Sequence, residues 1–463
     1  MQWITHSYLL GLAATLILAG KLGDRYGHRT LYLTGLVLFT LASVAIGLSN
    51  TATGLIGFRV AQGVAAGILM PQTLAILRAT FPREKFSMAV GIWGGVSSIA
   101  IAIGPTLAGA LESAFSWQSV FFINVPVAAV GLVYGLCFLP RTSFPTPGRF
   151  DVRGVIVLAV GLVATVFAIV QAETWGWADV RTLGLLAAGI LVIVGFVGLE
   201  SRIETRGGDA LLPLSLFRGT TVGTGGLMIA TNFFVLMGAT FVLPMFFINL
   251  RGATGLEAGL MLLPMSAVSI VSAPAGSVLV ARIGTRATAV LSLGLTTLGL
   301  LGLLNVSATS SYGITAVTLV VLAMGTGMTI TAGAEAIMGS APVHLAGVAG
   351  GFQSTCIQIG GAVGTAVMSA IVTANVHSAT TTLGLGEAGL QGLAQGSVPA
   401  NLDAGAATIA EGAYVSGLHA AFLVAAVVVA AVAVAALVTL RGVRPGRVQR
   451  VVRKSVDGGA AHS

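Results

Sequence analysis

Long apolar segments separated by short basic loops constrain this chain more than any other feature of its sequence. Hydrophobic residues make up 56% of the 463 residues and charged residues only 8%, whereas soluble domains carry about 25% charged residues. A helix needs roughly 20 apolar residues to cross a hydrocarbon core of ~30 Å. Because backbone polar groups must be paired in lipid, segments of this length predict transmembrane helices rather than barrel strands.

Thirteen such segments predict an all-α integral membrane protein with about 13 transmembrane helices. They lie at residues 4–20, 30–48, 53–77, 87–111, 118–139, 152–171, 182–199, 221–249, 256–280, 287–304, 312–339, 345–374 and 417–440.

The basic residues predict the orientation of these helices. If the loop at 20–30 is cytoplasmic and the sides alternate, all but three of the 23 Lys and Arg residues fall on the cytoplasmic side. Arg181 and Arg251 fall outside, and Arg59 lies within a helix. This asymmetry is the positive-inside pattern of membrane proteins. It predicts that Met1 is exterior and that the basic tail, 441–463, is cytoplasmic.

Composition excludes several other functions. The net charge of +8 does not indicate nucleic-acid binding, because the basic residues stand in short clusters between apolar segments. The two cysteines lie in apolar segments and the six histidines show no ligand spacing, so no metal site is predicted. No Gly-x-x-x-x-Gly-Lys-Ser/Thr loop is present, so no ATP-hydrolysing site is expected. No nucleophile–base pair suggests an enzyme.

The first loop has a distinctive sequence, Gly-Lys-Leu-Gly-Asp-Arg-Tyr-Gly-His-Arg, at 20–29. Its glycines allow a tight turn between two helices, and Asp24 can accept hydrogen bonds from the free N–H groups of a helix start or pair with an Arg. The candidate site residues of this loop are Gly20, Asp24, Arg25, Gly27 and Arg29. An ordinary basic loop is the alternative interpretation.

Arg59 is the only basic residue well inside an apolar helix, where Gln62 and Gly63 follow it. A buried Arg costs ~2.5–3.5 kcal/mol on insertion scales and typically marks a pathway or a charge pair. The alternative is an Arg whose side chain extends to the outer interface.

The fourth segment carries Gly104, Pro105 and Gly109 in a Gly-Pro-x-Leu-x-Gly pattern. Proline removes a helix hydrogen bond and bends the helix, and glycines allow a neighbouring helix to approach. A generic kinked membrane helix would have the same features.

Four further polar or aromatic residues within helices are candidates for lining a cavity. Asn232, Gln353 and Gln358 could equally form hydrogen bonds between helices, and Trp93 precedes a glycine in the fourth segment. Glu335, one turn from a predicted cytoplasmic end, is expected at a solvated helix terminus.

Together these motifs resemble the major facilitator superfamily, and in particular its fourteen-helix drug:proton antiporter group. The stretches at 116–118, 121–126, 175–177, 212–218 and 358–364 also resemble that group. The resemblance implies that Asp24 and Arg25 form a cytoplasmic charge latch, that Arg59 serves proton coupling, and that Gly104 and Pro105 belong to the motif of exporters. His28 departs from the family pattern, which has Arg or Lys there.

The resemblance also implies two helical bundles with two inserted helices. The predicted divisions are a five-helix N-terminal bundle at 1–139, two extra transmembrane helices and loops at 140–218, a six-helix bundle at 219–440 and the basic tail. Gln2 and Trp3 resemble the start of the group's second helix. The first family helix, which carries an Asp, is therefore expected to be absent from this sequence.

The predicted function is proton-coupled efflux of small lipophilic or cationic compounds by alternating access. The implied partners are the small-molecule substrate, protons and the lipid bilayer of the cell (inner) membrane. No cofactor is expected, because the proton gradient supplies the energy. The expected oligomeric state is a monomer. The alternatives are a facilitator or importer of a small metabolite, or a membrane sensor that transports nothing.

The charge pattern makes a topology prediction. Reporter domains fused after Arg149 and after Arg206 should report a cytoplasmic location, and a fusion near Gly392 an exterior one, because basic loops stay inside. Activity of paired cytoplasmic and exterior reporters measures this. An exterior signal at Arg206 would contradict the pairing of the sixth and seventh segments.

Overall fold

The computed structural model describes residues 2–440, except for 141–150, 178, 209, 218, 385, 396, 398–401 and 403. The described residues form helices joined by short loops, with no strand among them. The basic tail and the loop at 141–150 that carries Arg149 lie outside the described residues.

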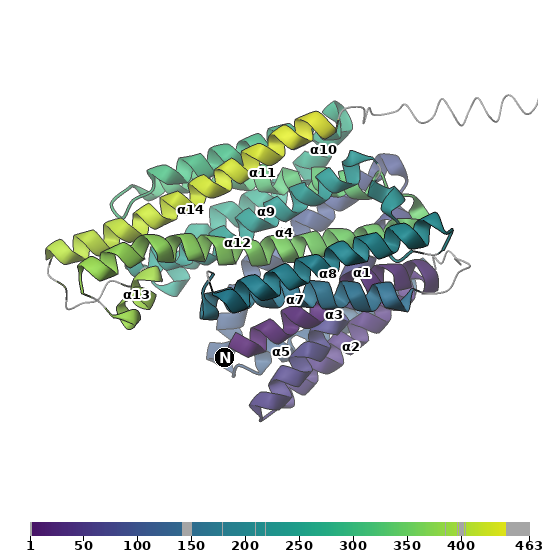
Figure 1. The fold of residues 1–463 in the computed structure, drawn as a ribbon, viewed down its shortest axis with the longest axis horizontal. Coiled ribbons are helices and arrows are strands. Elements are labelled where there is room, and N and C mark those ends of the chain that lie inside the picture. The colour runs from purple at the N-terminus through teal and green to yellow at the C-terminus, as the bar shows by residue number, and fades with distance from the viewer. Residues whose placement is uncertain are drawn as a thin grey trace, which may run out of the picture.

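Many of the long helices run roughly along the long axis of the molecule (Figure 1). The helices are α1 (Gln2–Tyr26), α2 (His28–Leu48), α3 (Ala52–Thr80), α4 (Arg83–Ala114), α5 (Ser119–Phe122), α6 (Asn124–Phe138), α7 (Val152–Trp175), α8 (Val180–Thr205), α9 (Thr220–Met245), α10 (Gly255–Gly302), α11 (Tyr312–Met338), α12 (Ala346–Thr382), α13 (Glu387–Ala394) and α14 (Ala404–Thr439). Four short helical turns accompany them: Leu214–Phe217, Phe246–Leu250, Leu303–Asn305 and Val343–Leu345.

The number of spanning helices agrees with the sequence. Among the described residues, 11 helical segments are long and apolar enough to cross a membrane. One of them contains α10, whose 48 residues are two helices joined at Gly284, where the backbone leaves the helical conformation. The 32-residue α4 is also long enough to span. The prediction of about 13 helices and an all-α multi-pass membrane protein is therefore confirmed.

Turn chemistry explains several helix boundaries. Gly27 has a φ of 95° between α1 and α2, a conformation that favours glycine. Thr51 caps α3 by accepting a hydrogen bond from Gly54 N at 3.1 Å. Thr254 and Glu257 form a reciprocal capping box at the start of α10. These caps pair N–H groups that would otherwise be left free at the helix starts.

The largest apolar core lies among α9, α10, α11, α12 and α14. Helices α1, α2 and α3 pack on one another, whereas α4 packs mainly against α10 and α11 and only weakly against α3. Helices α7 and α8 form a pair, and α7 contacts both α1 and α12. This pair therefore lies where the first and last groups of helices meet. The predicted division into bundles at 139 and 218 remains a prediction.

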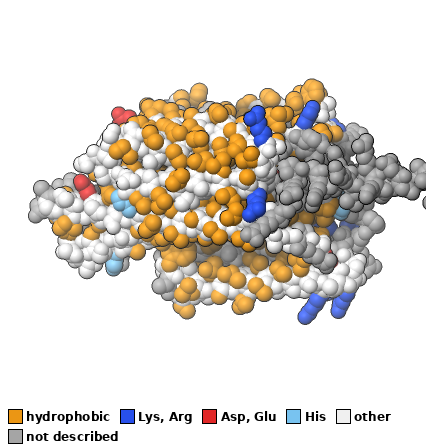
Figure 2. All heavy atoms as spheres, turned by 90° about the horizontal axis from the view of Figure 1, so that it is seen from above, with side chains coloured by type: hydrophobic (Ala, Val, Ile, Leu, Met, Phe, Trp, Pro, Cys, Tyr) orange, Lys and Arg blue, Asp and Glu red, His pale blue; other side chains and the backbone are white. Residues whose placement is uncertain are grey.

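The two ends of the molecule differ in charge. We call the end that carries the α1–α2 turn the inner end; it is on the right in Figure 1, where α14 also finishes. Thr220, which begins α9, donates a hydrogen bond to Thr439 O at 3.0 Å, so the start of α9 also lies at the inner end. On the face drawn in Figure 2, Lys and Arg side chains lie to the right of centre. This distribution agrees with basic loops gathered on one side of a membrane.

Gly284 gives a test of the fold. Its φ of 85° and ψ of 162° lie in a region that side chains other than glycine rarely adopt. Gly284→Ala should therefore destabilise the protein by about 1–3 kcal/mol, measured as a lower midpoint of thermal unfolding in detergent. Gly294→Ala is the control on the same element, since nothing lies within 4 Å of its Cβ position. Equal midpoints for the two variants would contradict this reading of the kink.

Candidate functional site

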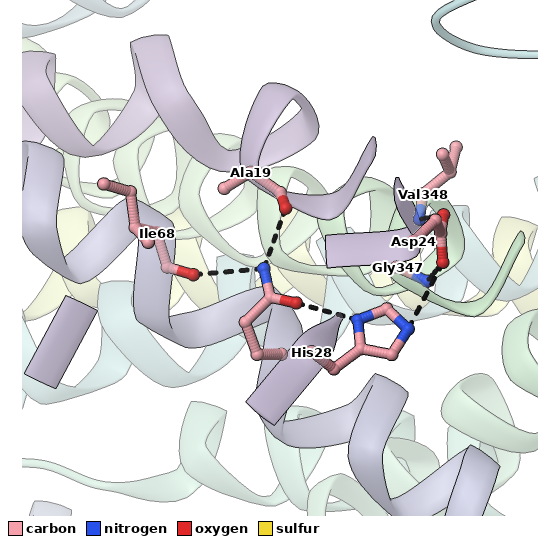
Figure 3. Close-up of polar contacts among 7 residues, drawn as sticks. Ala19, Asp24, His28, Ile68, Gly347 and Val348 are labelled. Atoms are coloured by element: carbon pink, nitrogen blue, oxygen red, sulfur yellow. Dashed lines mark hydrogen bonds and ion pairs between the residues drawn. The ribbon is translucent and has the colours of Figure 1, made fainter. Parts of the chain in front are cut away.

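The Asp24 carboxylate closes the inner end by binding the first residues of α12. Its Oδ1 accepts a hydrogen bond from Gly347 N at 2.7 Å, and its Oδ2 accepts one from Val348 N at 3.0 Å (Figure 3). Asp24 is 3% exposed. The free N–H groups and the dipole of a helix start favour an anion. A carboxylate at the end of α1 thus holds a helix that lies 323 residues away in sequence.

His28 and Gln72 support this carboxylate from the other side. The Nε2 of His28 lies 3.3 Å from Asp24 Oδ1, and its Nδ1 lies 2.9 Å from Gln72 Oε1. The Gln72 amide donates to Ala19 O at 2.8 Å and to Ile68 O at 3.1 Å, which orients it as the acceptor for His28. Figure 3 shows the imidazole between the two side chains. We call Asp24, His28, Gln72 and the start of α12 the inner latch.

Glycines bring the helix backbones close enough for the inner latch to form. A Cβ at Gly20 would collide with the carbonyl oxygen of Gly347. One at Gly350 would lie 2.7 Å from Pro71 O, and one at Gly351 2.8 Å from Leu16 O. Side chains at these positions would force α12 away from α1 and α3. The Gly20 of the first loop therefore serves helix contact.

The other predicted residues of the first loop do not bind Asp24 in the described structure. Arg25 stacks near the Tyr26 ring at 5.8 Å, and its Nη1 is buried without a hydrogen-bond partner among the described residues. Arg29 donates to Leu136 O at 2.6 Å and so joins α2 to α6. Gly27 makes the turn described above. Of the two partners expected for Asp24, an Arg or the N–H groups of a helix start, the structure shows the second, because Gly347 N and Val348 N bind its two oxygens.

A second contact at the inner end joins α4 to α11. Ser87 donates a hydrogen bond to Glu335 Oε2 at 2.8 Å, and Glu335 is only partly exposed. Glu335 lies in the last turn of α11 and is partly exposed, and it also binds α4 through Ser87. This interaction was missed because the two residues are 248 apart and belong to no motif.

A cavity lies farther along the molecule, between α4, α9, α10 and α11. It has aromatic and apolar walls with scattered hydroxyls and no charged side chain among its lining residues. The lining is Trp93, Gly94, Ser97, Phe233, Leu236, Met237, Thr240, Met265, Ser266, Ser269, Thr326, Gly327 and Ile330. Such walls suit an apolar molecule with a few hydrogen-bonding groups.

Only one of the four residues predicted to line a cavity lies in this lining. Trp93 does so, whereas Asn232 and Gln353 are 1% and 0% exposed and lie outside it. Neither the nitrogen nor the oxygen of these two amides has a hydrogen-bond partner in the described structure. Gln358 is partly exposed on α12 and is also outside the lining. The predicted contacts of Asn232 and Gln353 between helices are also not seen.

The Gly104–Gly109 segment of α4 faces open space. No described atom lies within 4 Å of a Cβ built at Gly104 or Gly109, so the predicted close approach of a neighbouring helix is not present. In the inner half of α4 the neighbouring helix is close. A Cβ built at Gly91 would lie 3.0 Å from Pro274 Cα of α10, and one built at Gly95 would lie 3.0 Å from Ile270 O. The close glycine contacts of α4 with α10 therefore lie in the inner half of α4 among the described residues. The Pro105 side chain lies outside the described structure.

Arg59 has aromatic and amide partners on the N-terminal helices. Its guanidinium stacks over the Tyr8 and Phe121 rings at 5.4 and 5.1 Å, and its Nη1 donates to Gln62 Oε1 at 2.9 Å. Gln62 is 2% exposed and donates to Ser43 Oγ at 2.7 Å. This network holds the guanidinium between α1, α3 and α5.

The neighbouring Gly63 allows α1 to approach α3, because a Cβ there would collide with Tyr8 O. The network and the glycine together place the three predicted coupling residues at one helix junction. No acidic side chain pairs with Arg59 in the described structure, so cation–π contacts and Gln62 carry its stabilisation.

Known proteins with related sequences or folds are membrane transporters. The family model described as Major Facilitator Superfamily matches residues 1–365. The Tetracenomycin C resistance and export protein of Streptomyces glaucescens is 39% identical over 377 residues, which cover 81% of this chain and 69% of that protein. The Multidrug resistance protein Stp of Mycobacterium tuberculosis is 34% identical over 375 residues, with the same coverage.

A third relative and a solved structure are also similar to this chain. The Methylenomycin A resistance protein of Streptomyces coelicolor is 33% identical over 380 residues, covering 80% of this chain and 78% of that protein. The human organic anion transporter MFSD10 superposes with a TM-score of 0.59 at 16% identity, over 92% of this chain and 82% of that one. With a family model that matches most of its length, this chain belongs to the major facilitator superfamily of membrane transporters.

Proposed function

We propose that this protein exports small lipophilic compounds from the cell in exchange for protons. The observation that carries the proposal is the set of relatives at 33–39% identity, whose names describe drug and antibiotic resistance or export. The cavity between α4 and α11 supports it, because its aromatic, methionine and hydroxyl lining suits an apolar molecule. The absence of a carboxylate among those lining residues favours selection by lipophilicity over selection by positive charge.

Alternating access is the proposed mechanism. The contacts described above join the helix groups at the inner end, through Asp24 with α12 and Ser87 with Glu335, and the close glycine contacts of α4 with α10 lie in the same half of α4. This arrangement fits a state closed to the inner side. Breaking the inner latch would let the helix groups tilt and expose the cavity to the other side.

The proton gradient is the proposed energy source, because the chain carries no phosphate-binding loop for ATP. Arg59 is the proposed coupling residue. Its guanidinium rests on two aromatic rings rather than on a carboxylate, so a nearby change of charge would move it readily. The proposed setting is a monomer in the cell membrane with the inner end in the cytoplasm.

A facilitator or importer is the alternative within transport. Everted membrane vesicles distinguish the two, because they present the inner side to the medium. An exporter coupled to protons should accumulate a lipophilic fluorescent drug when the vesicle interior is acidified, and should lose it when a protonophore is added. Drug accumulation that ignores the proton gradient would overturn the proposal, as would an unchanged resistance panel in a drug-sensitive host.

Arg59 gives the first test of coupling. Arg59→Ala should be inserted normally, since removing a charge from an apolar helix costs nothing on insertion scales, yet should abolish drug accumulation driven by the proton gradient. Arg59→Lys should keep part of it because a cation remains. Accumulation in vesicles, normalised to the amount of protein, measures both.

Arg251→Ala is the matched control. Arg251 also stacks on an aromatic ring, Phe246 at 5.1 Å, and binds backbone carbonyls, but it lies at the outer end of α9. Its loss should leave coupling intact. If Arg59→Ala accumulates the drug as fully as the unsubstituted protein, Arg59 serves the outer membrane interface and takes no part in transport.

Asp24 gives a test of the inner latch. Asp24→Asn keeps one acceptor oxygen but loses the charge and one of two charge-assisted hydrogen bonds, a loss of about 1–3 kcal/mol. The state open to the inner side should therefore gain about tenfold in population. The measurement is the labelling rate of Ala349→Cys, a fully buried position, in a chain whose two native cysteines are replaced by serine.

Asp179→Asn is the control for this test. Asp179 also accepts a hydrogen bond at a helix start, from Arg181 N at 2.7 Å, but at the opposite end of the molecule. In the Asp179→Asn variant, the cysteine at position 349 should be labelled as fast as in the same protein with Asp179 unchanged. If Asp24→Asn labels no faster than Asp179→Asn, the carboxylate does not hold the gate.

A further inference from the structure

A strap of residues 210–217 joins α8 to α9 at the inner end. Ala210, Leu211 and Leu212 are 4%, 1% and 8% exposed, although they belong to a loop. Leu211 and Leu212 pack in one apolar cluster with Ile17 of α1 and Val348 of α12. Val348 N is one of the two groups that bind Asp24. The strap is therefore packed directly against the inner latch.

Three polar contacts hold the strap in this position. Lys21, in the first loop, donates from Nζ to Ala210 O at 2.9 Å. Leu212 N donates to Glu200 Oε2 at 3.1 Å, and Ser215 N donates to Glu204 Oε1 at 3.0 Å. The Phe217 ring packs edge-on against Phe352 of α12, with centroids 5.0 Å apart. Displacing the strap would thus break contacts to α1, α8 and α12 together.

Glu200 is fully buried beneath the strap, at 0% exposure. Asp151, at the start of α7, accepts a hydrogen bond from Gly154 N at 3.0 Å through Oδ1. The remaining oxygens, Glu200 Oε1 and Asp151 Oδ2, have no hydrogen-bond donor among the described residues. Both converge on Gly154: a Cβ built there would lie 2.7 Å from Glu200 Oε1 and would collide with Asp151 Oδ2.

Two carboxylate oxygens that face each other in a buried site repel unless a proton lies between them. Paired carboxyl groups in proteins therefore share one proton, so that one acts as donor and the other as acceptor. The other oxygen of each carboxyl group already accepts a backbone hydrogen bond. Leu212 N donates to Glu200 Oε2, and Gly154 N donates to Asp151 Oδ1. Asp151 is partly exposed, which gives the proton a path to water at the inner end.

Other charged side chains lie on the helices that carry or contact this pair. Lys21 of α1 donates to the Ala210 carbonyl, and Glu204 of α8 accepts from Ser215 N. Arg153 and Arg202, on α7 and α8, are exposed and screened by solvent. The first turns of α12, from 346 to 355, carry no titratable side chain.

We propose that Asp151 and Glu200 form a proton-binding site that shares one proton and thereby keeps the strap docked on the inner latch. Loss of that proton to the inner solution leaves two buried negative charges in contact. Their repulsion separates α7 from the Glu200 carboxylate, frees the Leu212 N–H and loosens the strap. The site lies apart from Arg59 and from the cavity, so it links the pH at the inner side to the gate rather than to the substrate.

The protonation of the Asp151–Glu200 pair sets the direction in which pH acts on the gate. At lower inner pH the pair holds its proton, and the strap and gate stay closed. As the inner pH rises the proton leaves, and opening to the inner side becomes easier. This direction suits an exporter that must load its substrate from a proton-poor side, but the proton site itself does not depend on that function.

Hydrogen–deuterium exchange of the strap peptide tests the proposal in the purified full-length protein. In the unsubstituted protein, protection of residues 210–217 should fall as pH rises from mildly acidic to mildly alkaline, after correction for intrinsic exchange. Glu200→Gln and Asp151→Asn each supply an amide donor in place of the shared proton. At high pH the strap amides of both variants should exchange about tenfold more slowly than those of the unsubstituted protein.

Glu204→Gln is the control, because Glu204 binds the same strap through Ser215 N, whereas Glu200 binds it through Leu212 N. Its protection should fall with pH as in the unsubstituted protein, while Glu200→Ala should lose protection at every pH. Protection that does not change with pH in the unsubstituted protein would overturn the proposal. So would Glu200→Gln following the unsubstituted profile. Because this readout needs no substrate, a failed transport assay would count against export and leave the proton site unaffected.

Discussion

The contact between Asp24 and the start of α12 is the interaction on which the described arrangement depends. One carboxylate accepts two N–H groups at a helix start, in a site from which water is almost excluded. In such surroundings a hydrogen bond to a charged group contributes about 1.5–3 kcal/mol. No other single side chain in the described structure joins the first helix to α12 by two such bonds. The glycines of α1 and α12 and the strap are arranged around it.

The pair of helices α7 and α8 gains a structural role from this geometry. Helix α7 contacts both α1 and α12, and the segment after α8 packs its leucines against the same two helices. The pair therefore does more than add length to the chain. It packs beside the inner latch, and the strap connects its Glu200 carboxyl group to the residues around Asp24. A change in their charge would be transmitted by packed side chains, without any change in the cavity.

Much of the fold could be predicted from the sequence, because the constraint of lipid on backbone polar groups is severe. Apolar length gave the helices, and basic loops gave their expected sides. The turn at Gly27 followed from residue type, whereas the contact of Gly20 with α12 was not expected. A helix start was one of two partners expected for Asp24, but the sequence did not indicate that this helix would be α12. Nothing in the residue pattern indicated that His28 and Gln72 would meet.

The remaining errors have one physical source. Asn232 and Gln353 were expected either to line a cavity or to form hydrogen bonds between helices, because polar groups in apolar helices usually need a partner or water. In the described state both amides are buried without partners. Leaving such a group unpaired costs about 1–3 kcal/mol, so this closed arrangement carries a penalty of the same order as the bonds that Asp24 contributes.

A penalty and a gain of similar size are what an alternating transporter requires. Two conformations interconvert usefully only when their free energies differ by a few kcal/mol. The charged latch favours closure at the inner end, and the partnerless amides oppose it. If opening the gate brings water or substrate to Gln353 and Asn232, it recovers much of the energy lost when Asp24 leaves α12. Replacing either amide by an apolar residue of similar size would then shift the balance toward the closed state, even though neither residue contacts the latch.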